Sequence, residues 1–104
     1  MHATIRRYEG VDPNRTDELS KKVAETLAPK LSKLPGFAGY YLIEAGNGVF
    51  SSFGLFETLE QGAESTRVAA AWVRDEKLET VLPKAPEITS GEVIAHQNGV
   101  PARV

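Results

Sequence analysis

The first part of the chain reads as a strand followed by a helix. Residues 2–9 include Thr4, Ile5 and Tyr8 and end at Gly10, a composition that predicts a strand. Hydrophobic residues then recur at every fourth position, which predicts an amphipathic helix. The residues that form this stripe are Leu19, Val23, Leu27 and Leu31.

Proline marks both ends of this helix and a point inside it. Asp12-Pro13 supplies a capping side chain followed by proline at the first helical position, and Thr16 is a competing start. Pro29 removes a backbone donor inside the stripe, so we expect a kink there or a helix that restarts after it. Pro35-Gly36 ends the segment.

Residues 37–45 and 49–57 flank Gly46-Asn47-Gly48 and predict a hairpin. A turn at Asn47-Gly48 would place Tyr41 opposite Gly54, and a turn at Gly46-Asn47 would place it opposite Ser52. Both registers sort the side chains onto the same two faces, since they differ by two residues. One face is expected to carry Tyr41, Ile43, Phe50, Ser52 and Phe56. The other is expected to carry Tyr40, Leu42, Phe53 and Leu55.

The remaining pattern predicts a second helix and a last strand. Thr58-Leu59-Glu60-Gln61 is a capping box, and the apolar stripe that it opens runs past Trp72 as far as Leu82. Residues 88–96 predict a strand with Gly91 as a candidate bulge. The order strand, helix, strand, strand, helix, strand is typical of the α+β ferredoxin-like fold, with a four-stranded antiparallel sheet and two helices on one face. We expect residues 1–97 to form this single domain and residues 98–104 a C-terminal tail.

Two helices cannot cover both faces of this sheet. The face left over would expose an aromatic patch of a size that soluble monomers avoid. A second copy stacked sheet to sheet, with twofold symmetry, would bury it. The candidate interface residues are Tyr40, Leu42, Phe53 and Leu55, or the opposite set if the helices cover those.

Composition narrows the class further. The 104 residues carry a formal charge of −2, with 25% charged and 41% hydrophobic residues and no cysteine. This balance predicts no nucleic-acid or membrane partner and no disulfide or thiolate chemistry. The N-terminal sequence lacks the apolar stretch of a signal peptide, so we expect a cytoplasmic protein.

Two adjacent arginines are the most informative polar residues. Arg6 and Arg7 lie on what should be a central strand, so they must point to opposite faces. A buried guanidinium needs a carboxylate or an anionic ligand. An ion pair is favoured over a free guanidinium that would bind an acidic or enolate oxygen. The candidate partners are Glu92, Glu44 and Glu57.

Aromatic residues predict a pocket between the sheet and the helices that suits a flat ligand. Its candidate lining residues are Arg6, Tyr8, Tyr41, Phe56 and Trp72, with Phe50 beside them. Core packing is the favoured alternative for these aromatic side chains. The candidate metal ligands are His2 and His96, with Glu92 as a third, but histidines at strand ends are more often exposed. We therefore expect no metal and no cofactor.

The chain resembles the dimeric α/β-barrel superfamily, in particular small proteins related to antibiotic-biosynthesis monooxygenases. The residues that carry the resemblance are Leu34-Pro35-Gly36-Phe37-Ala38-Gly39-Tyr40, Leu55-Phe56-Glu57-Thr58 and Ala71-Trp72, and it extends over residues 1–96. It implies two copies that join sheet to sheet into an α/β barrel. The superfamily includes cofactor-independent oxygenases of quinol-like substrates, haem-degrading enzymes and lactone isomerases.

The resemblance disfavours haem degradation. That branch uses an Asn on strand 1, a Trp at the end of strand 3 and a His on helix 2, whereas here the corresponding strand positions hold Arg6 and Phe56 and the second predicted helix has no histidine.

Three functions follow from these expectations. The first is an oxygenase without a cofactor, whose aromatic or quinol-type substrate itself activates oxygen. In that case Tyr41, Arg6 and Trp72 would position and polarise the substrate. The second is a non-catalytic ligand-binding or stress-related homodimer, and the third is an assembly protein with a fully packed cavity.

Overall fold

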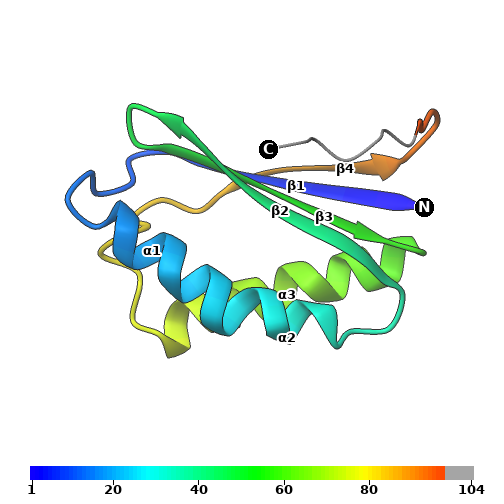
Figure 1. Cartoon of the computed structure of the whole chain (residues 1–104), viewed down its shortest axis with the longest axis horizontal. Helices are drawn as coiled ribbons and strands as arrows, with labels where there is room; N and C mark the ends of the chain where they lie inside the picture. Colours follow the sequence, from blue (N-terminus) through cyan, green and yellow to red (C-terminus); the bar gives the residue numbers. More distant parts are fainter. Residues whose placement is uncertain (98–104) are drawn as a thin grey trace, which may run out of the picture.

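A four-stranded antiparallel sheet lies over one layer of helices in the computed structural model, which describes residues 1–97 (Figure 1). The strands are β1 (His2–Tyr8), β2 (Phe37–Gly46), β3 (Val49–Phe56) and β4 (Glu87–Glu92), in the order β2-β3-β1-β4. The helical segments are α1 (Thr16–Lys22), η1 (Val23–Leu27), α2 (Ala28–Ser32) and α3 (Leu59–Asp75). The predicted α+β ferredoxin-like fold is confirmed, while the tail predicted at 98–104 lies outside the described residues.

The first helix, α1, starts at Thr16 and not at Asp12-Pro13. The Oδ1 atom of Asp12 accepts the backbone N–H of Asn14 at 2.9 Å, so this side chain closes a turn and does not cap the helix. The restart predicted at Pro29 is confirmed. One π-helical turn, η1, precedes α2, and the backbone N–H of Ala28 reaches Val23 O. The widened turn accommodates the proline, which has no N–H to donate.

Helix α3 begins as predicted but ends earlier. Thr58 Oγ1 accepts the N–H of Gln61 at 3.2 Å, and Gln61 Oε1 accepts the N–H of Thr58 at 3.0 Å, which completes the capping box. The helix ends at Asp75, and Lys77 follows with a φ of 57°. The last part of the predicted stripe, including Leu78 and Leu82, is buried in the irregular segment before β4. Strand β4 is shorter than predicted, and its Gly91 pairs in register with Ala3 without a bulge.

A bulge in β2 overturns the predicted faces of that strand. The turn is Asn47-Gly48, with Gly46 opposite Val49, but a register shift between Glu44 and Gly46 leaves one extra residue in β2. Tyr41 therefore pairs with Phe53, not with Gly54 or Ser52. The face toward the helices carries Tyr40, Leu42, Phe50, Ser52 and Phe56, and the outer face carries Tyr41, Ile43, Phe53 and Leu55.

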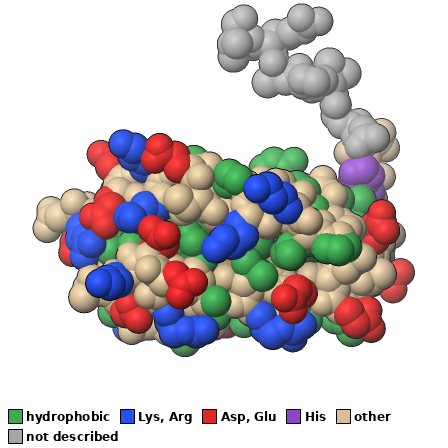
Figure 2. Space-filling view, turned by 90° about the horizontal axis from the view of Figure 1, so that it is seen from below, with side chains coloured by type: hydrophobic (Ala, Val, Ile, Leu, Met, Phe, Trp, Pro, Cys, Tyr) green, Lys and Arg blue, Asp and Glu red, His purple; other side chains and the backbone are tan. Residues whose placement is uncertain are grey.

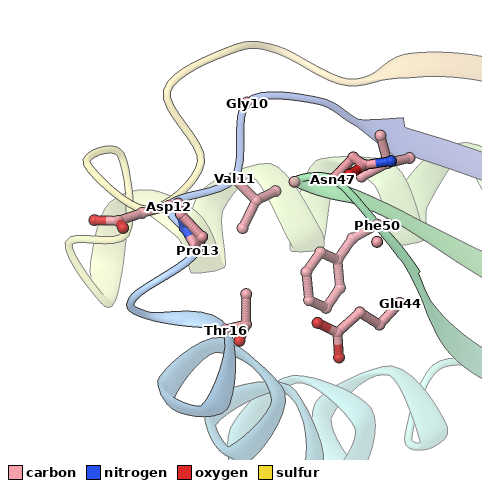
Figure 3. A pocket seen from close by; sticks show the side chains of 11 residues that line it. Gly10, Val11, Asp12, Pro13, Thr16, Glu44, Asn47 and Phe50 are labelled. Atoms are coloured by element: carbon pink, nitrogen blue, oxygen red, sulfur yellow. The ribbon is translucent and has the colours of Figure 1, made fainter.

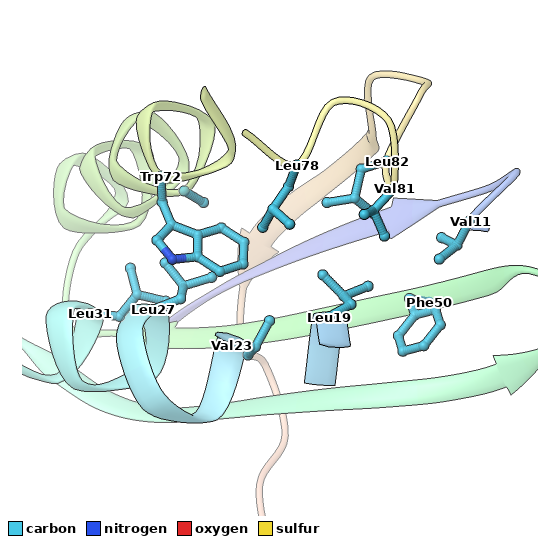
Figure 4. Close-up of a cluster of buried hydrophobic side chains, with 11 residues drawn as sticks. Val11, Leu19, Val23, Leu27, Leu31, Phe50, Trp72, Leu78, Val81 and Leu82 are labelled. Carbon is cyan, nitrogen blue, oxygen red and sulfur yellow. The ribbon is translucent and has the colours of Figure 1, made fainter. Parts of the chain in front are cut away.

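The hydrophobic core lies between the sheet and the helices (Figure 4). Trp72 of α3 lies close to Leu27 of η1 and Leu31 of α2. Phe50 and Val11 close the end of the core beside the hairpin. Figure 2 shows the helix side of the molecule, where charged side chains of both signs are scattered among hydrophobic ones. This surface is typical of a solvent-facing layer.

Candidate functional site

Arg6 is the central residue of the candidate site. It projects from β1 toward the helices and is 1% exposed. Its Nη1 donates to Thr66 Oγ1 of α3 at 3.3 Å, whereas Nε and Nη2 have no hydrogen-bond partner. The favoured prediction of an ion pair with Glu92, Glu44 or Glu57 is wrong, because no ion pair to Arg6 is found among residues 1–97. All three glutamates are exposed, and Glu92 pairs across the strands with His2.

Two spaces meet at Arg6 and Tyr8, which line both of them. The larger, about 280 Å³, lies between α3 and the irregular segment before β4. Its other lining residues are Thr66, Ala70, Val73, Glu79, Leu82, Pro83, Lys84, Ala85, Pro86 and Ile88. The smaller, about 20 Å³, lies deeper and has room for one water molecule. Its other lining residues are Leu19, Val23, Leu27, Tyr40, Leu42, Phe50, Ser52, Trp72 and Leu82.

Two tyrosines bring phenol groups to the same region. Burial raises the pKa of Tyr8 above its usual value, and the positive charge of nearby Arg6 opposes that rise. Burial raises the pKa of Tyr40 in the same way, again against the effect of Arg6. Both phenols therefore stay protonated at neutral pH and can donate a hydrogen bond. Ser52, 2% exposed, adds a hydroxyl beside the Tyr40 phenol, and its Oγ makes no hydrogen bond of standard length and angle. The region is rich in hydrogen-bond donors and suits a negatively charged ligand atom.

Only some of the five predicted pocket residues line the cavity or the small space. Arg6 and Tyr8 line the cavity. Trp72 lines the small space, but its Nε1 donates to Thr26 Oγ1 at 2.7 Å and is not free for a ligand. Tyr41 is 61% exposed on the outer face, so its predicted place in the pocket is wrong because of the bulge.

Phe56 faces the helices but belongs to the core. Its ring packs edge-on against Phe37, with 5.8 Å between the ring centroids, and it lines neither space. The predicted interface set is corrected by the same bulge, since Tyr40 and Leu42 lie under the helices while Phe53 and Leu55 lie on the outer face.

Three residues of the site were missed by the sequence analysis. Tyr40 was assigned to the wrong face, and Thr66 carries no pattern of its own on an amphipathic helix. Ser52 did carry a signal. It is the polar residue on a strand face otherwise occupied by Phe50 and Phe56, and a buried hydroxyl in such a row indicates a ligand or a hydrogen-bond partner.

The most voluminous cavity, about 600 Å³, is an open cleft beside the hairpin turn and carries less chemistry (Figure 3). Phe50, Glu44 and Thr16 lie around it in Figure 3, with Asp12 and Pro13 at its edge. No buried side-chain atom without a hydrogen-bond partner lines it in the described part of the chain. We therefore place the candidate site at Arg6.

Within residues 1–97, no group of three or more His, Cys, Asp or Glu could hold a metal ion. His2 lies opposite Glu92, and His96 follows the end of β4. No helix in this part of the chain is long and apolar enough to span a bilayer.

Solved structures share this fold. A comparison with protein-family models finds no match, and neither does a comparison with curated proteins. A mutant of MhuD with two manganese protoporphyrin IX molecules bound per active site is 22% identical, with a TM-score of 0.74 over 95% of this chain and 100% of that one. A protein of unknown function from Nitrosomonas europaea is 21% identical, with a TM-score of 0.72 over 96% of this chain and 95% of that one.

A third similar structure carries a ligand. The monooxygenase from the gene ActVA-Orf6 of Streptomyces coelicolor, in complex with nanaomycin D, is 15% identical, with a TM-score of 0.68 over 97% of this chain and 92% of that one. At these identities the likeness establishes the fold. Two further solved structures, one of a putative antibiotic biosynthesis monooxygenase from Nitrosomonas europaea and one of an antibiotic biosynthesis monooxygenase, have the same fold, so the predicted resemblance is confirmed at the level of the fold.

Proposed function

We propose that this chain is a cytoplasmic homodimer that oxygenates a small aromatic, quinol-type molecule without a resident cofactor. The observation that carries the proposal is the group of donors around the cavity and the small space beside it. Arg6, Tyr8, Tyr40 and Ser52 stand ready to stabilise negative charge on a ligand, and two of them keep buried polar atoms unpaired. The monooxygenase of the same fold that holds nanaomycin D supports the same class of ligand.

The chemistry needs a substrate that supplies all the electrons. A ring ketone with a methylene carbon conjugated to its carbonyl, as in an anthrone or the keto form of a naphthol, loses a proton from that carbon, and the charge moves to the carbonyl oxygen. The donors of the site stabilise this oxyanion. The carbanion then reduces O₂, one oxygen atom becomes the new carbonyl, and the other leaves as water with the two hydrogens of the methylene. The four electrons that O₂ takes up all come from that carbon.

The dimer follows from the outer face of the sheet. Tyr41 is 61% exposed, Ile43 is 45% exposed, and Phe53 and Leu55 lie beside them across the strands. A second copy packed sheet to sheet would hide this surface behind about 800 Å² per partner. The interface set we propose is therefore Tyr41, Ile43, Phe53 and Leu55.

Oxygen uptake tests the proposed reaction. We expect the wild-type protein to consume O₂ with phenolic anthrone-type or naphthol-type substrates and to form one carbonyl per O₂. Arg6→Gln should lower the rate by about a hundredfold, as for the loss of one oxyanion donor. Arg67→Gln, which removes the same charge from the exposed surface of α3, should leave it unchanged. No uptake above the rate without protein would overturn the oxygenase proposal.

A second candidate is a ligand-binding homodimer that performs no reaction. The cavity lining favours it in one respect, because Glu79 is its one carboxylate and no histidine is present to accept the proton. Binding of a quinol without O₂ uptake would support this candidate.

A further inference from the structure

We propose that Arg6 makes this cavity specific for an aromatic carboxylate, and that its Nε and Nη2 bind the two carboxylate oxygens side by side. The inference rests on the proposed binding of an aromatic ligand at this site, but it does not require that the ligand be oxidised.

The free atoms of Arg6 form one edge of the guanidinium. Nη1 is occupied by Thr66, and the two atoms without a partner are Nε and Nη2. Their N–H bonds run parallel, so this edge matches the two oxygens of a carboxylate and forms a pair of charge-assisted hydrogen bonds. A single phenolate oxygen would satisfy the edge less well. The free edge therefore favours a carboxylate over a lone oxyanion.

No carboxylate of the described residues takes this place. Arg6 is 1% exposed, and a guanidinium keeps its positive charge in proteins. A buried charge without a counter-charge is strongly destabilising, and a ligand carboxylate would offset this cost. Water in the small space can satisfy one N–H, but it cannot neutralise the charge.

The surroundings define the rest of the ligand. A volume of about 280 Å³ with an apolar wall of Ala70, Val73 and Leu82 admits one or two fused rings. With the carboxylate on Arg6, the neutral hydroxyl of Tyr8, which lines the same cavity, remains available for an oxygen on the ring. Lys84 and Glu79 both line the cavity and carry opposite charges, so the selection between anion and neutral ligand falls to Arg6.

Binding of matched probes tests the proposal. The probes are 1-hydroxy-2-naphthoate, its methyl ester and 1-naphthol, followed by calorimetry and by the fluorescence of Trp72, the single tryptophan. We expect the acid to bind about ten- to a hundredfold more tightly than the ester, the range for a hydrogen bond to a charged group. Arg6→Gln should abolish this preference, and Arg6→Lys, which keeps the charge but loses the edge, should lower it in part. Arg67→Gln should retain it.

The outcomes separate the two proposals. Equal affinity of the wild-type protein for acid and ester, or an unchanged preference in Arg6→Gln, would overturn the carboxylate proposal. The wild-type comparison needs no variant, so it stands even if Arg6→Gln fails to fold. Preference for the acid without O₂ uptake would leave the carboxylate site standing and remove the oxygenase. Uptake of O₂ by a wild-type protein that binds acid and ester equally would do the reverse.

Discussion

The indole of Trp72 is fixed by Thr26, a residue 46 positions earlier in the chain, whose Oγ1 accepts the Nε1–H at 2.7 Å. The same hydroxyl donates to Lys22 O at 2.6 Å. Because Thr26 lies in the π-helical turn η1, the irregularity that accommodates Pro29 also orients the largest side chain of the core. The Thr26 hydroxyl thus connects η1 to α3.

Removal of that hydroxyl should loosen this connection. Thr26→Val should lower the free energy of unfolding by about 1 kcal/mol, because the indole N–H loses its partner. Urea unfolding followed by Trp72 fluorescence measures the change. Thr26→Ser keeps the hydroxyl and should behave like the wild-type protein. A valine variant as stable as wild type would show that the bond contributes nothing to stability.

Replacement of the buried charge should stabilise the free protein. Arg6→Met keeps a long side chain and removes an uncompensated guanidinium, so the free energy of unfolding should rise by about 1–4 kcal/mol. The exposed control Arg67→Met should change it by less than about 0.5 kcal/mol. Urea titration in the absence of ligand makes this comparison. A large loss of stability in Arg6→Met would mean that the arginine is satisfied in the free protein.

Gly36 and Gly46 offer a pair of glycines with similar backbones and different surroundings. Their φ values are 76° and 86°, but a Cβ on Gly36 would overlap Gln61 Oε1, whereas nothing lies within 4 Å of one on Gly46. Gly46→Ala should cost about 1–2 kcal/mol for its conformation alone. Gly36→Ala should cost about 1 kcal/mol more, because Gln61 must leave its capping box.

A double variant checks this explanation of the Gly36 effect. In a Gln61→Ala background the extra cost of Gly36→Ala should vanish, since there is no longer a side chain to displace. Persistence of the full cost in that background would assign it to the backbone of the turn.

High pH should destabilise the protein through Tyr8 and Tyr40. Burial raises the pKa of both phenols in the folded state, so the unfolded chain loses these protons first, near pH 10. The stability that depends on the neutral phenols is complete below about pH 10 and is lost as the pH rises through the folded-state pKa values. Urea midpoints from about pH 8 to pH 11 should fall in the wild-type protein and fall less in Tyr8→Phe/Tyr40→Phe.

A charge on the outer face should prevent dimer formation. Phe53→Asp would be introduced twice near the twofold axis of a sheet-to-sheet dimer, and it should yield monomers or aggregates in sedimentation. Leu59→Asp, at an exposed position at the start of α3, should sediment as a dimer like the wild-type protein. A wild-type monomer at micromolar concentration would contradict the stacked-sheet arrangement.

The order and type of the elements could be predicted because each has a strong local signal. The capping box at Thr58 and the break at Pro29 depend on neighbouring residues, and both are confirmed. The faces of β2 could not be predicted, because Tyr40 and Leu42 are as hydrophobic as Tyr41 and Ile43. Alternation alone therefore cannot tell inside from outside in this strand.

The site could be predicted only in part, because local patterns show which face a residue lies on but not what lies opposite it. Arg6 and Tyr8 could be predicted as lining residues, because they lie two positions apart and therefore on one face of a central strand. Whether a carboxylate reaches Arg6 depends on tertiary distances between β1 and residues far along the chain. No local pattern records those distances.

The extra residue in β2 between Glu44 and Gly46 means that chain length at the hairpin decides which side chains face the cavity, as much as side-chain chemistry does. Deletion of Ala45 would remove this bulge and exchange the two faces along the strand, Leu42 with Ile43 as well as Tyr40 with Tyr41. The phenol that now meets Arg6 would then point to solvent. We expect that, in proteins of this fold, a length change of one residue at this point is accompanied by a rearrangement of the cavity. Alignments of such proteins should therefore be anchored on the bulge and not on the tyrosine pair.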